Sequence, residues 1–132
     1  MEYRRYGSSG DALSIVAFAG IVVANETSEN SDRYVSWAID QGINYFDVAP
    51  SYGNAQNMLG PALEPYRKDV FLACKTNNRD ARSVQAELEA SLRLLRTDHF
   101  DLYQLHAMST ERDLEIATGP GGALEVFLRA RD

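Results

Sequence analysis

The sequence predicts an α/β fold in which parallel strands alternate with covering helices. Two observations indicate this class. Short runs rich in β-branched and aromatic residues alternate four times with segments whose apolar residues recur at helical spacing. A pair of short strand candidates around a glycine-containing turn precedes this alternation. Such an order is typical of a parallel sheet covered by helices, and not of an antiparallel sandwich.

The N-terminal region is predicted to form a hairpin followed by the first strand of the main sheet. Residues 3–6 and 13–16 are the two hairpin strands, and the turn between them contains Gly7 and Gly10. We expect the second hairpin strand to continue into the first sheet strand. The nearly apolar run 13–24 is shorter than the roughly 20 residues that a membrane-spanning helix needs.

Helical and strand periods place the remaining elements. Val35, Ala38 and Ile39 form the apolar stripe of a first helix, which Gly42 is suited to end. The later predicted elements are a strand at 43–47, a short helix around 58–63, a strand at 70–75, a long helix at 83–96, a strand at 100–106 and a last helix at 123–131.

Four strand–helix units are half of a (β/α)₈ barrel, for which about 250 residues are typical. We therefore expect residues 1–132 to form a single domain, consisting of the N-terminal hairpin and about four βα units, half of a TIM barrel. On this prediction the chain is truncated after its fourth helix.

Composition excludes several function classes. The net charge is −6 and the sequence pI is about 4.9, with no block of basic residues, so we expect neither nucleic acid nor an anionic membrane as a partner. Cys74 is the only cysteine, which excludes an internal disulfide and a cysteine metal cluster. A chain of this kind fits the reducing cytoplasm.

Four polar side chains are predicted to meet where the strands end. Asp47, Lys75 and His106 end the second, third and fourth predicted sheet strands, and Tyr52 lies on the loop after the second. The carboxyl ends of parallel strands form one rim of a barrel, where α/β enzymes build their sites. Because side chains alternate along a strand, the three strand-end residues should face the barrel interior, and Cys74 should pack against the helices.

These four residue types suit proton delivery to a carbonyl oxygen. A tyrosine phenol, with an ordinary pKa of about 10, is a weak acid at neutral pH, and a nearby ammonium group stabilises its phenolate. Lys75 is placed to supply that ammonium, and Asp47 to hold it charged and oriented. His106 would hydrogen-bond the substrate oxygen and align it with Tyr52. None of these side chains can supply a hydride, so reduction would require a nicotinamide.

These residues lie within stretches that resemble a known family. They are G-I-N-Y-F-D-V-A-P-S-Y-G, L-G-P-A-L, V-F-L-A-C-K-T and S-L-R-L-L-R-T-D-H-F-D-L-Y-Q-L-H, and the chain resembles the N-terminal half of the aldo-keto reductases. For the full-length parent, the resemblance implies a (β/α)₈ barrel that reduces a small aldehyde or ketone to an alcohol with NADPH, or with NADH. It makes Asp47, Tyr52, Lys75 and His106 the catalytic tetrad, with Tyr52 as proton donor and Asp47 on the nicotinamide side of the rim.

Departures from the family keep other readings open. Gln56 stands where the family commonly has glutamate, and the family holds the cofactor's phosphate and adenine groups mainly on its last βα units, which this sequence does not contain. One alternative is a catalytically inactive half-barrel that acts as a binding, regulatory or self-associating module, paired with a second copy or with a complementary half-barrel. Another is an aldolase-type site in which Lys75 forms a Schiff base.

Overall fold

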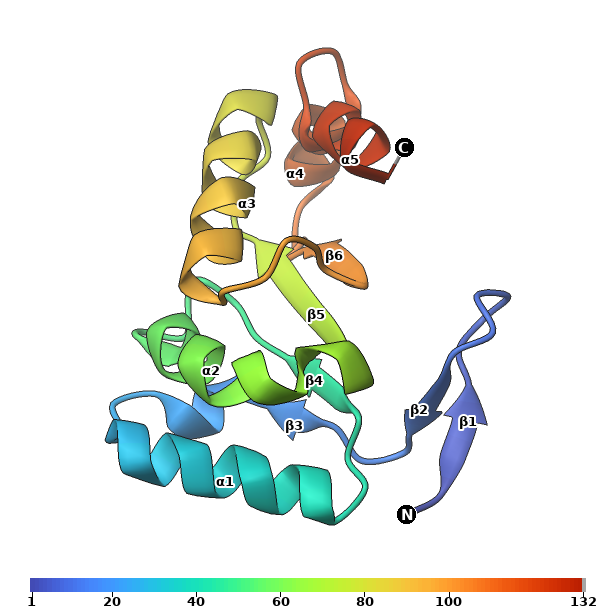
Figure 1. Ribbon diagram of the computed structural model, residues 1–132. Coiled ribbons are helices and arrows are strands. Elements are labelled where there is room, and N and C mark those ends of the chain that lie inside the picture. The colour runs from blue at the N-terminus through green and yellow to red at the C-terminus, as the bar shows by residue number, and fades with distance from the viewer. Residues whose placement is uncertain (132) are drawn as a thin grey trace.

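The computed structural model describes residues 1–131 and contains two sheets (Figure 1). Strands β1 (Tyr3–Arg5) and β2 (Ala12–Ser14) pair antiparallel as the predicted hairpin. The main sheet is parallel, with the strand order β3-β4-β5-β6. Its strands are β3 (Phe18–Ala19), β4 (Tyr45–Asp47), β5 (Phe71–Thr76) and β6 (Leu102–Leu105). The α/β class and the order of strands are as the sequence predicts.

Helices follow each strand of the main sheet. In chain order they are η1 (Gly20–Val23), α1 (Ser28–Asp40), α2 (Ala55–Leu63), η2 (Glu64–Asp69), α3 (Ala81–Leu94), α4 (Glu111–Thr118) and α5 (Ala123–Arg131), where η marks a 3₁₀ helix. Helices α1, α2 and α3 lie along one side of the sheet, and the hairpin projects on the other (Figure 1). No helix among residues 1–131 has the length and apolar character to cross a membrane.

Side-chain caps fix the starts of the two longest helices. The Thr27 hydroxyl accepts a hydrogen bond from Asn30 N at 3.1 Å, and the Asp80 carboxylate accepts one from Ser83 N at 2.9 Å. Each cap satisfies one backbone N–H that has no partner within its helix. Helix α3 therefore begins at Ala81, two residues before the predicted start. Helix α1 ends at Asp40, and Gly42 follows with a φ of +82°.

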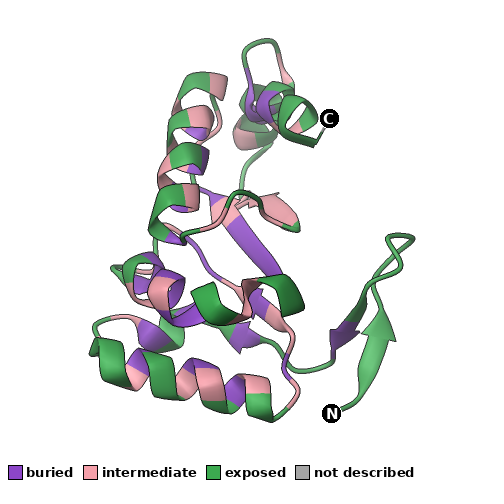
Figure 2. Cartoon of the chain, viewed as in Figure 1, coloured by how far each residue is buried: buried purple, intermediate pink, exposed green. Residues whose placement is uncertain are grey.

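The main core lies between the sheet and helices α1 and α2. Phe46, Leu72 and Cys74 are fully buried there, together with Val35 of α1 and Leu59 of α2. Figure 2 shows the buried residues concentrated on the central strands and on the inner faces of these helices. Leu72 and Cys74 occupy alternate positions of β5, which confirms the prediction that this set of side chains faces the helices.

A second cluster joins the last three helices. Val84 of α3, Ala117 of α4 and Ala123 and Val126 of α5 are fully buried in it. Helix α4 was not among the elements predicted from the sequence. Its only buried residue is Ala117, while Leu114 is 55% exposed, so α4 has a weak apolar stripe. The Thr110 hydroxyl, which caps α4 by accepting from Asp113 N at 3.0 Å, was the available sequence signal.

The predicted continuation of the hairpin into the main sheet is wrong. Strand β2 ends at Ser14, and residues 15–17 separate it from β3. The Asn44 side chain bonds β2 on the edge away from β1: its Oδ1 accepts from Ser14 N at 2.8 Å and its Nδ2 donates to Ala12 O at 2.8 Å. Beyond Ser14, Ile15 N still donates to Glu2 O of the hairpin at 3.0 Å. The chain leaves β3 after two residues and enters the 3₁₀ helix η1, in which Ile21 and Val22 are half exposed.

Candidate active site

The predicted site residues lie at the carboxyl edge of the parallel sheet. Asp47 is the last residue of β4, as predicted. Lys75 is the penultimate residue of β5, which Thr76 ends, and His106 follows the last residue of β6. The His106 N–H donates to Thr76 O at 2.9 Å, so the pairing of β5 and β6 extends as far as this histidine. Tyr52 lies in the loop between β4 and α2.

Asp47 and Lys75 form an ion pair on the rim. Asp47 is the register partner of Ala73, two residues before Lys75, so both side chains project from the same face of the sheet. Lys75 Nζ donates a hydrogen bond to Asp47 Oδ1. The lysine side chain is 13% exposed and the aspartate side chain 24% exposed. A pair this sheltered is screened less by solvent than a surface pair, so the contact holds the lysine side chain in place at the rim.

The Tyr52 ring lies between the lysine and the histidine. Lys75 Nζ is 5.4 Å from the centroid of the Tyr52 ring and lies over its face. The His106 and Tyr52 ring centroids are 5.9 Å apart, with an interplanar angle of 86°. Within residues 1–131 no hydrogen bond joins Lys75 Nζ to the Tyr52 hydroxyl, so the ammonium meets the phenol through the ring face. The four predicted residues therefore form one contiguous group.

Tyr45 is a second phenol on the same face of β4. Burial, and then the Asp47 carboxylate, raise the pKa of Tyr45 above its ordinary value of 10.0. A higher pKa makes this phenol a weaker acid at neutral pH. Tyr45 also packs edge-on against Phe71, with ring centroids 5.6 Å apart. We therefore interpret Tyr45 as a packing residue below the rim.

Gly20, the first residue of η1, allows the chain after β3 to approach the end of β4 closely. A Cβ atom added at Gly20 would lie 2.9 Å from Asp47 O and 2.9 Å from the side chain of Val48. Any larger residue would push β3 away from the end of β4. The missing side chain at Gly20 thus leaves room for the backbone oxygen of Asp47 at the rim.

Gln56 and Cys74 belong to the helix side of the sheet. Gln56 is 5% exposed, and its Nε2 donates to Ser91 Oγ at 2.8 Å and to Cys74 Sγ at 3.5 Å. Burial raises the pKa of the Cys74 thiol to about 11. The thiolate is thus scarce at neutral pH, as the prediction of a packing cysteine requires. Gln56, the departure from the family pattern, lies in a buried contact between α2 and α3.

Sequence reasoning missed the residues that surround His106. The ring nitrogen Nδ1 lies 3.0 Å from Asn77 Oδ1 and 3.3 Å from Ser51 Oγ. Arg79 donates from Nη2 to His106 O at 2.6 Å and to Ala107 O at 3.2 Å. Asn77 follows Lys75 by two residues, which was the one available signal that it shares the lysine's side of the sheet.

This arrangement defines a class of protein. A parallel sheet with helices on one face, and with a carboxylate, an amine, an imidazole and a phenol gathered at its carboxyl edge, is the arrangement of a (β/α)-barrel enzyme site. The sequence profile of the Aldo/keto reductase family matches residues 22–127. The chain belongs to the aldo/keto reductase family.

Individual relatives agree with this assignment. Aldo-keto reductase YhdN of Bacillus subtilis is 36% identical over 126 residues, covering 80% of this chain and 38% of that protein. Methylglyoxal reductase YeaE of Escherichia coli is 42% identical over 72 residues, covering 52% of this chain and 25% of that protein. The solved holo form of an aldo-keto reductase from Bacillus halodurans superposes with a TM-score of 0.77 at 26% identity, covering 98% of this chain and 47% of that one.

The solved relatives are (β/α)₈ barrels, so the sheet of four strands corresponds to part of such a barrel. The chain spans about two fifths of the length of the first of these curated relatives. The described rim thus corresponds to one portion of the relatives' barrel edge.

Proposed function

We propose that this chain carries the proton-transfer residues of a carbonyl reductase that uses NADPH, or alternatively NADH. The observation that carries the proposal is the unbroken contact series from Asp47 through Lys75 and Tyr52 to His106. Family membership supports an oxidoreductase in general, and the series supplies groups suited to protonate an oxygen. The nicotinamide, when bound, supplies the hydride that these side chains lack.

Each residue has a distinct role in the proposed reaction. Tyr52 donates the proton of its hydroxyl to the substrate oxygen as that oxygen gains negative charge. Lys75, held by Asp47, keeps a positive charge against the phenol ring, which stabilises the phenolate left behind. His106 lies beside Tyr52 and orients the substrate oxygen by a hydrogen bond. The product is an alcohol, and a solvent proton restores Tyr52.

We assign the nicotinamide end of the cofactor to this rim, because its residues suit a carbonyl that lies beside a hydride source. The Lys75–Asp47 pair and the Tyr52 phenol lie at one edge of the sheet. Together they can supply a proton to the oxygen of a carbonyl that receives a hydride. Asp47 is the residue of this chain that we assign to the nicotinamide side of the rim. The cofactor's phosphate and adenine groups are assigned to no residue of this chain.

Small aldehydes are the proposed substrate class. Two relatives carry the name methylglyoxal reductase, one from Escherichia coli and one from Yersinia pestis. Methylglyoxal is therefore the first substrate to test, with NADPH consumption as the readout. Turnover that Tyr52→Phe abolishes without unfolding the chain supports the proposal. Turnover retained in that variant rejects Tyr52 as the acid.

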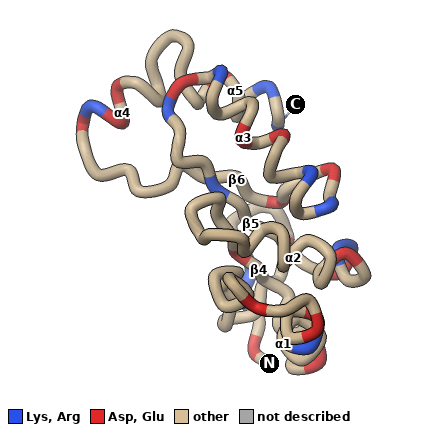
Figure 3. The backbone as a smooth tube through the Cα atoms, turned by 90° about the vertical axis from the view of Figure 1, so that its left-hand side faces the viewer, with Lys and Arg blue, Asp and Glu red and all other residues tan. Residues whose placement is uncertain are grey.

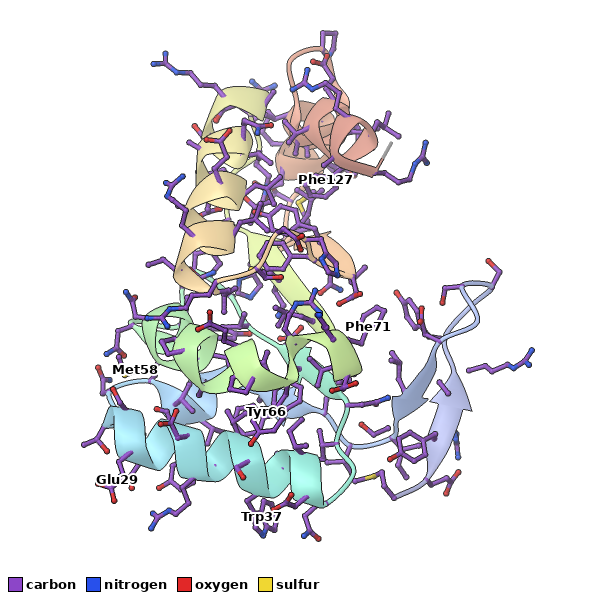
Figure 4. All side chains as sticks on the ribbon, in the orientation of Figure 1. Glu29, Trp37, Met58, Tyr66, Phe71 and Phe127 are labelled. Carbon is purple, nitrogen blue, oxygen red and sulfur yellow. The ribbon has the colours of Figure 1, made fainter. Side chains whose placement is uncertain are left out.

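A self-associating module is the second candidate function. Within the described residues, β3 and β6 each have one strand edge without a sheet partner. A cavity of about 400 Å³ lies beside β6, and Phe100, Tyr103 and Phe127 are among its lining residues. Trp37 is 63% exposed and projects from α1 away from the sheet, at the other end of the molecule (Figure 4). Both edges of the sheet thus offer backbone groups to a partner, and the β6 edge also offers apolar surface.

We propose a second copy of this chain as the partner, because four strands from each copy would match the eight of the relatives' barrels. Figure 3 shows acidic and basic positions interspersed along α3 and α4, while α1 carries Glu29, Asp32 and Asp40 against one arginine, Arg33. Light scattering over a wide concentration range tests the idea. A mass that stays at 14.7 kDa contradicts it, and stable binding only to a complementary half-barrel would replace the second copy as partner.

A further inference from the structure

The imidazole of His106 is held by residues that the proposed reaction does not use. Its Nδ1 is 3.0 Å from Asn77 Oδ1. A side-chain amide oxygen can only accept a hydrogen bond, so Nδ1 carries the hydrogen in this contact. Ser51 Oγ, at 3.3 Å from the same nitrogen, is a longer second contact. Nε2 makes no hydrogen bond with any of residues 1–131.

Asn77 is itself anchored from helix α3. The Glu87 carboxylate accepts hydrogen bonds from Asn77 N at 2.9 Å and from the Thr76 hydroxyl. Thr76 is fully buried, and its Oγ1 also accepts from Asn78 N at 3.1 Å. These bonds fix the backbone where β5 ends, so the Asn77 side chain projects from a held position and not from a loose loop.

The backbone of His106 is anchored from the same loop. Arg79 donates to His106 O and Ala107 O, and also to Asn77 O at 3.1 Å. Ala107 has a φ of +52°, which costs a residue other than glycine free energy and persists only where neighbouring contacts enforce it. The loop after β5 therefore contacts His106 at two points. Arg79 bonds its backbone oxygen, and Asn77 bonds its imidazole ring.

We propose that Asn77 is a positioning residue, whose side-chain oxygen holds the His106 ring in its Nδ1–H tautomer and leaves Nε2 as the nitrogen that meets the substrate oxygen. In histidines generally, the hydrogen bond that one ring nitrogen makes determines which of the two nitrogens carries the proton. The functional part of this inference rests on the proposed function. In the neutral ring Nε2 accepts from an alcohol hydroxyl, and it donates to a carbonyl oxygen once the ring is protonated.

Nitrogen NMR of the 132-residue chain tests the tautomer directly. Two-bond ¹H–¹⁵N correlations, recorded at a pH where imidazoles are neutral, distinguish the two ring nitrogens. The sequence has two histidines, and His99→Gln assigns the His106 signals. We expect Nδ1–H in the wild type and in Asn77→Asp, which keeps an acceptor oxygen. We expect a shift toward Nε2–H in Asn77→Ala, and no change in Ser51→Ala.

Two NMR results would overturn the proposal. They are an Nε2–H tautomer in the folded wild type, and an Nδ1–H tautomer that persists in Asn77→Ala. The wild-type measurement stands even if a variant fails to fold. Because it requires neither cofactor nor substrate, its failure is distinct from failure of the proposed function. In methylglyoxal turnover, Asn77→Ala frees the ring orientation of His106, so it should lower kcat about tenfold with little change in KM, and Asn77→Asp should recover part of the loss. A loss of equal size in both variants would also count against Asn77.

Discussion

Arg79 offers a quantitative test of how the loops behind the rim are held. Its guanidinium forms an ion pair with Asp113 at 3.3 Å and donates to four backbone oxygens. The Arg79 side chain is only 13% exposed. Arg112 forms a similar pair with Glu115 at 3.4 Å, but its side chain is 78% exposed. The two arginines thus differ in burial and in backbone contacts, and hardly in ion-pair distance.

The expected cost follows from that difference. Arg79→Ala removes hydrogen bonds to four backbone oxygens, each contributing about 0.5–1.5 kcal/mol, so we expect a loss of about 3 kcal/mol. Arg112→Ala should change the free energy of unfolding by no more than about 0.5 kcal/mol. With a urea slope of about 2 kcal/mol per molar, Arg79→Ala lowers the midpoint by about 1.5 M.

Urea unfolding followed by circular dichroism measures both variants under the same conditions. Arg79→Lys is a further control, because an ammonium keeps the charge but cannot reproduce the planar set of donors. We expect it to recover less than half of the loss. Equal midpoints for Arg79→Ala and Arg112→Ala would refute the argument that Arg79 holds the loops after β5 and β6.

Three further predictions concern the core, a helix cap and the cysteine. Leu72→Ala, at a fully buried position, should cost about 2–5 kcal/mol by urea unfolding. The bond from Ser83 N lowers the pKa of Asp80 below its ordinary 3.8, so the unfolded chain binds the proton more readily and this contribution to stability is lost as the pH falls through the folded-state pKa. Asp80→Asn should show a shallower loss of stability below about pH 4, and an unchanged acid slope would count against the cap. Cys74, whose pKa is raised to about 11, should react with a thiol reagent at pH 8 only when urea unfolds the chain, and fast labelling of the native chain would contradict its burial.

The main sheet could be predicted because its strands carry a strong local signal. The strand around Phe46 and the strand around Leu72 are apolar runs bounded by polar turns, and the ends of those runs gave Asp47 and Lys75 to within one residue of the observed strand ends. The stripe of Val84 and Leu88 gave α3 in the same way. In each case, burial of one face of the element requires apolar residues at regular spacing, and this pattern is visible in the sequence.

The features that sequence reasoning missed depend on contacts between distant segments. The end of β2 is bonded by the side chain of Asn44, 30 residues away. The Arg79 contacts with His106 and Ala107 cross 27 and 28 residues. Hydrogen bonds from polar side chains to loop backbones follow no regular spacing in the sequence. Polar residues occur in most loops, so their presence alone does not show which of them make such bonds. The catalytic roles of the four rim residues remain a prediction.

The central claim is that Tyr52 protonates the substrate oxygen in a reaction driven by NADPH. The most direct test is to follow NADPH consumption with methylglyoxal for the wild type and for Tyr52→Phe, with circular dichroism to verify that both are folded. We predict turnover by the wild type and a rate lower by about 10²–10⁴ in Tyr52→Phe. Equal rates, or no NADPH binding and no turnover by the folded wild type, would contradict it.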